Sequence, residues 1–324
     1  MTTQTSKIQT PASHWLGYAA CVAAGCLWGT GFYFGRLALN EMSVEYMVLY
    51  RFLFSILGLL PVLLRNRVRF RRAELRMLLA SAALWIPIQF LLQFHGLART
   101  TVSHAALMVG AMPVMLALGA TVFAHERLDW IGWTAIAAST IGVLLVVAGG
   151  NHSAAHGGPT FTGDMLVVVS LFAALISILM NKRLMQLHSP PVVTAWLLLT
   201  GTIMLLIMIL GPLLVKPFCL RLGLPNHSAP IPFTHVSPTA WTALAISGIF
   251  CTAITTMLWN WGIHHVPASR AGVFLNIEPA LGSVLGVKLL GEHLGPYAWL
   301  GGGMIVGAAV VMTARSQPPE VVLE

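Results

Sequence analysis

Long stretches without charged residues alternate with short polar segments along almost the whole chain. A bilayer core about 30 Å thick needs about 20 apolar residues for each spanning helix. Runs of this kind predict spans at about 16–37, 44–63, 75–98, 102–124, 129–149, 163–183, 192–214, 237–263, 268–289 and 295–314. They are continuously apolar rather than alternating, which favours helices over a β-barrel. The predicted fold is an all-α polytopic membrane protein with about ten transmembrane helices.

Composition and charge agree with a membrane protein. Of the 324 residues, 57% are hydrophobic and 9% are charged, whereas soluble domains carry roughly a quarter charged residues. The net charge of +8 does not indicate nucleic acid binding, because the arginines gather in one predicted loop, at Arg65, Arg67, Arg69, Arg71, Arg72 and Arg76. Basic loops stay in the cytoplasm. We therefore expect both termini to be cytoplasmic, in what is predicted to be a bacterial inner membrane.

An internal repeat divides the chain. Residues 93–113 and 259–279 align without a gap at an offset of 166, so that Ser103 falls on Ser269 and Pro113 on Pro279. Near the start of each half the best offset is 146. The predicted units are residues 14–149 and 163–315, followed by a tail at 316–324. Because five helices is an odd number, the second unit enters the membrane inverted, an arrangement that recurs in carriers with a midplane site.

Several motifs resemble one transporter family. They are Trp28-Gly29, Arg51-Phe52, Pro113 followed by Glu126-Arg127-Leu128, and Pro267 to Ala271 through Glu278-Pro279 to Gly291-Glu292. Together they resemble the paired EamA domains of the drug/metabolite transporter superfamily, most of all the YddG-type amino-acid exporters. The resemblance implies ten helices, with a central cavity formed mainly by helices one to four and six to nine. Helices five and ten are then expected at the periphery.

Two charged residues fall well inside the predicted spans, Arg51 and Glu278. A charge at membrane depth costs about 2.5 to 3.5 kcal/mol on insertion scales and usually marks a functional site. Glu278, next to Pro279, is a candidate for binding an ammonium group or carrying a proton. Arg51 is a candidate for binding a carboxylate or pairing with an acid at a gate. The structural alternatives are an Arg51–Glu278 pair, a protonated Glu278, and an Arg51 side chain that reaches the headgroups.

Other polar and aromatic side chains at membrane depth are candidates for solute binding, namely Trp28, Tyr50, Gln93, His95, Trp259, Asn260, Trp261 and Asn276. Each of them alone can equally be a helix–helix contact. Glu126 and Glu292 lie at helix ends, where we expect them to cap or to interact with the dipole of the next helix. The pairs Gly282/Gly286 and Gly303/Gly307 have the spacing of close helix packing.

The function predicted from these features is the export of amino acids or related small metabolites by alternating access. A drug, nucleoside or sugar-conjugate carrier is the alternative within the class, and a passive channel or an intramembrane enzyme the alternative outside it. The chain contains no Walker loop, Gly-x-Ser-x-Gly or His-Glu-x-x-His motif, and its cysteines lack metal or redox spacing. We therefore expect no catalytic residue, cofactor or metal. The expected partners are a solute and the bilayer, with the oligomeric state open and a monomer plausible.

Overall fold

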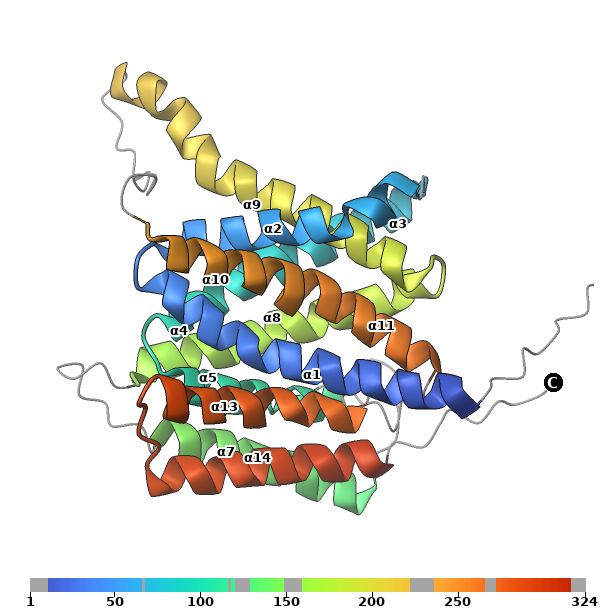
Figure 1. Ribbon diagram of the computed structural model, residues 1–324, viewed down its shortest axis with the longest axis vertical. Helices are drawn as coiled ribbons and strands as arrows, with labels where there is room; N and C mark the ends of the chain where they lie inside the picture. Colours follow the sequence, from blue (N-terminus) through green and yellow to red (C-terminus); the bar gives the residue numbers. More distant parts are fainter. Residues whose placement is uncertain are drawn as a thin grey trace, which may run out of the picture.

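The computed structural model describes residues 11–65, 68–115, 118–119, 129–148, 159–221, 236–265 and 272–315 (Figure 1). Within these ranges the chain is helical and contains no strand. The first half comprises α1 (Pro11–Leu39), α2 (Val44–Arg65), α3 (Arg72–Ala83), η1 (Leu84–Phe90), α4 (Leu91–Leu97), α5 (Val102–Val109) and α7 (Trp130–Ala148). The second half comprises α8 (Phe161–Met185), α9 (Pro190–Arg221), α10 (Pro238–Gly248), η3 (Ile249–Ile254), α11 (Thr255–His265), η4 (Gly272–Asn276), α13 (Ile277–Leu289) and α14 (Pro296–Arg315).

Six helical segments in the described ranges are long and apolar enough to cross a membrane, and two shorter apolar helices cover Val102–Met115 and Pro296–Val311. The prediction of an all-helical membrane protein is confirmed, while the count of ten spans stays a prediction. The start of α1 and the end of α14 lie at the same end of the bundle in Figure 1. That arrangement is compatible with termini on one side of the membrane, and their cytoplasmic location stays a prediction.

Polar side chains fix where several helices begin. The Thr101 hydroxyl accepts the His104 backbone N–H at the start of α5, and the Thr160 hydroxyl does the same for Gly163 at the start of α8. Ser237 caps α10 in the same way by accepting the N–H of Ala240. Each cap satisfies a backbone donor that the helix itself leaves unpaired.

The third helix of each half contains a π-helical segment. In the first half η1 separates α3 from α4, and in the second η3 separates α10 from α11. A shift of 166 residues lays Leu84–Phe90 over most of η3, so the two segments are equivalent in the repeat. Pro87 lies in η1, and a proline removes a backbone donor. π-Helical turns often mark functional sites, which directs attention to the side chains between them.

Glycines allow the helices to approach closely. A Cβ added to Gly29 of α1 would lie 2.9 Å from Leu281 Cβ on α13, and one added to Gly282 would lie 2.6 Å from Ala106 Cβ on α5. The packing role predicted for Gly282 and Gly286 is therefore confirmed. The same prediction is wrong for Gly303 and Gly307 as far as the described residues go, because a Cβ added to either would meet no atom of another helix within 4 Å.

Helices α7 and α14 pack against each other at one edge of the bundle (Figure 1). Helix α1 packs against α11 and α13, which brings the first half into direct contact with the second. The side chains between the halves are therefore supplied by helices on both sides of the repeat.

Candidate functional site

Arg51 lies inside the bundle between the two π-helical segments. Its side chain is only 5% exposed, and its Nε donates a hydrogen bond to Thr252 Oγ1 of η3 at 3.1 Å. The guanidinium carbon lies 5.4 Å from the ring centroid of Phe90 in η1 and 5.2 Å from that of Phe94 in α4. Aromatic faces attract cations at this range. Arg51 is thus held in place by both halves rather than extending to the headgroups.

Glu278 lies where η4 gives way to α13, in the first turn of the α-helix. Its backbone touches α1, because a Cβ on Gly29 would lie 3.1 Å from Glu278 O. The carboxylate interacts electrostatically with Arg51, yet no direct ion pair joins the two among the described residues. The structure therefore places the two predicted charges near each other but separates them.

Neither charge has a counterpart in the repeat. The offset of 146 places Leu197 opposite Arg51, and the offset of 166 places Met112 opposite Glu278. One half therefore supplies the cation and the other the anion. Ala174, opposite Trp28 at the offset of 146, extends this asymmetry to the aromatic residues.

Some of the predicted aromatic residues meet and others do not. Trp28 of α1 and Trp259 of α11 lie with ring centroids 5.5 Å apart and planes inclined by 54°. Tyr50 packs instead against Trp241 of α10, at 4.8 Å. Trp261 is 43% exposed and belongs to a different face of α11 from its buried neighbour Asn260.

The remaining predicted residues are distributed around the bundle. Asn260 donates from Nδ2 to Thr194 Oγ1 of α9 at 3.1 Å, which is the helix–helix contact that was the structural alternative. His95 Nε2 lies 3.2 Å from Glu45 Oε1, so it joins the end of α4 to the start of α2. Gln93 and Asn276 are buried, the first on α4 and the second at the end of η4.

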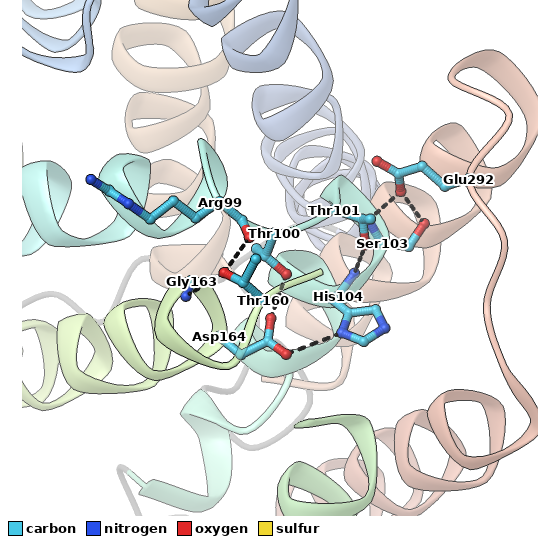
Figure 2. Close-up of polar contacts among 9 residues, drawn as sticks. All are labelled: Arg99, Thr100, Thr101, Ser103, His104, Thr160, Gly163, Asp164 and Glu292. Carbon is cyan, nitrogen blue, oxygen red and sulfur yellow. Dashed lines mark hydrogen bonds and ion pairs between the residues drawn. The ribbon is translucent and has the colours of Figure 1, made fainter. Parts of the chain in front are cut away.

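A second polar cluster lies at the end of the bundle opposite the start of α1 and the end of α14 (Figures 1 and 2). There Glu292 accepts hydrogen bonds from the backbone N–H groups of Val102 and Ser103 and from the Ser103 hydroxyl, at 2.7, 2.8 and 2.7 Å. Glu292 thus caps α5. The prediction that it caps is confirmed, but the prediction that it serves the next helix is wrong, because the helix that it caps belongs to the other half.

The backbone before Glu292 is shaped by a glycine. Gly291 has a φ of 66°, a conformation that glycine adopts without steric cost. The N–H of Glu292 donates to Gly286 O at 3.1 Å, which ends α13. This turn directs the Glu292 carboxylate toward the start of α5.

Asp164 of α8 is the other acid of this cluster, and it was not among the predicted site residues. Its carboxylate accepts a hydrogen bond from the Thr100 hydroxyl and lies 3.4 Å from His104 Nδ1, with the His104 and Asp164 side chains 2% and 0% exposed. The Thr160 hydroxyl donates to Arg99 O at 2.7 Å nearby. Figure 2 shows that these contacts join the α4–α5 segment of the first half to α8 of the second.

Comparison with known families agrees with this architecture. The EamA-like transporter family matches residues 15–148 and 161–314, which is nearly the whole chain in two copies. The chain belongs to this family. The EamA protein is accordingly an integral membrane protein with tandem EamA domains, and a transporter of small molecules.

Relatives of this EamA protein are similar to it over most of their length. An "Uncharacterized transporter" of Archaeoglobus fulgidus is 22% identical over 295 residues, which cover 89% of this chain and 94% of the relative. The "Inner membrane protein YtfF" of Escherichia coli is 23% identical over 95% of this chain and 98% of its own. The "Biotin transporter" of Salmonella typhimurium is 25% identical over 91% of both chains.

A solved crystal structure shares the fold of the EamA protein. The match has a TM-score of 0.57 at 16% identity and covers 93% of this chain and 96% of the chain in the solved structure.

Some predictions fall outside the described residues, among them the role of Glu126 and the motif from Pro267 to Ala271.

Proposed function

We propose that this EamA protein is a secondary carrier that exports amino acids or related small metabolites by alternating access. The two repeats, residues 14–149 and 163–315, are the halves that move relative to each other, and the solute binds between them. Support comes from the family and from relatives whose names describe transporters, one of them a transporter of biotin.

The separated charges of Arg51 and Glu278 carry this proposal. Charges inside a membrane protein usually pair with one another or face a water-filled path. Here one charge comes from each half, the two interact electrostatically, and no direct ion pair forms between them. An amino acid carries both a carboxylate and an ammonium group, so it is able to complement both charges. We assign Glu278 to the ammonium group or to a coupled proton.

The aromatic pair of Trp28 and Trp259 is the second element of the proposed site. Tryptophan faces attract ammonium groups, and this pair joins α1 of the first half to α11 of the second. The other predicted residues lie on the surrounding helices and are weaker candidates for contact with the solute: Tyr50, Gln93, His95, Asn260, Trp261 and Asn276.

Counterflow in proteoliposomes tests the proposal. Purified protein is reconstituted with unlabelled amino acids inside, and the uptake of labelled amino acids is followed. Glu278→Gln keeps the shape of the side chain and removes its charge, so we expect uptake to fall at least about tenfold, as for the loss of a charged hydrogen bond.

The matched control is Glu41→Gln, the same change at an exposed acid in the loop between α1 and α2, which should transport like the unmodified protein. Equal counterflow in Glu278→Gln and Glu41→Gln, with both proteins folded, would contradict the assignment of Glu278. Absence of counterflow for every amino acid in the unmodified protein would reject amino-acid export.

A further inference from the structure

The guanidinium of Arg51 has more hydrogen-bond donors than the surrounding protein uses. Arginine carries five N–H donors in a planar fork. Among the described residues the only acceptor bonded to Arg51 is Thr252 Oγ1, which takes the Nε proton. Nη1 and Nη2 therefore have no protein acceptor there, although the residue is 5% exposed.

Arg36 is an arginine of the same chain whose guanidinium binds backbone carbonyls. Its Nη1 donates to Leu97 O at 2.7 Å and to Thr100 O at 3.4 Å, so it fastens the end of α4 to α1. In the part of the chain that the structure describes, Arg51 has no comparable contact with backbone carbonyls. A structural role of the kind that Arg36 has therefore does not account for Arg51.

Other polar atoms near Arg51 in the fold also lack partners. Ser55 Oγ, one turn further along α2, is buried without a hydrogen bond, and residues four apart share a helix face. Ser247 Oγ of α10 and Gln89 Oε1 of η1 are in the same condition. Helix α10 contacts α2 at this level, since a Cβ on Gly248 would lie 3.1 Å from Ser55 N. Buried polar groups are nearly always hydrogen-bonded in proteins, so this set points to a missing polar ligand.

The chemistry of the Arg51 guanidinium indicates which kind of ligand it binds. An unpaired buried cation is costly, and Glu278 does not form a direct ion pair with it. The planar fork of arginine matches a carboxylate with two parallel hydrogen bonds. The rings of Phe90 and Phe94 lie beside the guanidinium, and its Nη2 lies toward α1, where a Cβ added to Gly31 would lie 3.5 Å from it.

We propose that Arg51 is the carboxylate-binding residue of this carrier, and that the carboxylate binds between the π-helical segments η1 and η3. The inference rests on the proposed function and narrows it to solutes with a carboxylate, whether or not they carry an ammonium group. Amino acids and biotin both belong to this class. Ser55, Gln89 and Ser247 then supply further polar contacts to the solute.

Binding to the purified protein tests the inference without requiring transport. The unfolding midpoint is followed by tryptophan fluorescence in detergent while L-amino acids or biotin are added, each beside its neutral amide of the same shape. A ligand that binds only the folded protein raises the midpoint. We expect carboxylates to raise it and the amides to have little effect.

Substitutions then locate the residue that makes this distinction. Arg51→Met should abolish the preference for the carboxylate. Arg51→Lys, which keeps the charge but cannot form the planar fork, should weaken binding about 10- to 100-fold, as for the loss of a charge-assisted hydrogen bond. Arg36→Met removes a guanidinium whose Nη1 already donates to two backbone carbonyls, so it should keep the preference.

Three results would overturn the inference: equal effects of acids and amides in the unmodified protein, a carboxylate preference that survives in both Arg51 variants, or no effect of any carboxylate in the panel. A preference that depends on Arg51 without counterflow of amino acids would instead reject export and keep the binding site. The two proposals therefore fail in different ways.

Discussion

Two polar regions of the bundle join the same two halves but differ in how well their groups are satisfied. At the end of the bundle, Glu292 accepts three hydrogen bonds and Asp164 is engaged by Thr100 and His104 (Figure 2). Inside the bundle, Arg51 makes one hydrogen bond and Glu278, in the first turn of α13, makes none within the described residues. Acids at the end of the bundle accept several hydrogen bonds from the protein, whereas the described charges inside it have one or none.

The number of hydrogen bonds that a polar group makes with the protein distinguishes structural residues from functional residues better than residue type does. A buried network with every member satisfied rigidifies and specifies one arrangement. Charges without protein partners destabilise the fold, and they persist where a ligand supplies the missing contacts. The end cluster is therefore expected to determine stability, and the interior charges to determine binding.

The largest effect is expected from Glu292→Ala. The substitution leaves two backbone N–H groups at the start of α5 without an acceptor, and it leaves the Ser103 hydroxyl with only Ser283 O, at 3.2 Å. We expect the free energy of unfolding to fall by about 2 to 4 kcal/mol, and the unfolding midpoint in detergent to fall by several degrees. Glu292→Gln keeps one acceptor oxygen and should lose less. An unchanged midpoint in Glu292→Ala would contradict the expectation that the cluster at the end of the bundle determines stability.

A smaller effect of opposite sign is expected from Arg51→Met without ligand. Replacing a buried, poorly paired charge by an apolar side chain of similar volume is often neutral or stabilising. We expect an unfolding free energy that is unchanged or higher by about 1 to 2 kcal/mol, measured by the same midpoint. A loss as large as that of Glu292→Ala would mean that the protein itself satisfies the guanidinium.

Much of the helical framework was predictable from the apolar runs. The predicted span 44–63 is α2 (Val44–Arg65), and the predicted span 129–149 is α7 (Trp130–Ala148). These runs are long, uncharged and bounded by polar residues, which is the strongest signal that a membrane sequence gives. The π-helical segments were not predicted, because no residue pattern distinguishes them from α-helix and η3 contains no proline.

The candidate site was predictable in its residue types but not in its contacts. Arg51 and Glu278 were found because charge is rare at membrane depth. Their separation was not predictable, since it depends on how α2 packs against η3 and α1 against α13. The partners of Glu292 are about 190 residues away in the chain, at Val102 and Ser103, so local sequence favoured the wrong helix. Asp164 resembled an ordinary acid in a first helical turn until the fold placed His104 beside it.

The smallest effect is expected at Glu41, an acid that is satisfied like Glu292 but exposed to solvent. Its carboxylate accepts hydrogen bonds from the backbone N–H and hydroxyl of Ser237, both at 2.6 Å, and these bonds lower the pKa of Glu41 below its ordinary value.

A lowered pKa in the folded state adds stability above the pKa of the unfolded chain, and this stability is lost as the pH falls through the folded value. The unfolding midpoints of the unmodified protein and Glu41→Gln should therefore differ near neutral pH and converge in acid. Ser237→Ala removes the hydroxyl but keeps the backbone N–H, so it should lose only the hydroxyl's share of the pH-dependent part and, in addition, a constant part for the cap on α10. A difference between unmodified protein and Glu41→Gln that persists in acid would show that the charge of Glu41 is not what Ser237 stabilises, and would limit the comparison to acids inside the bundle.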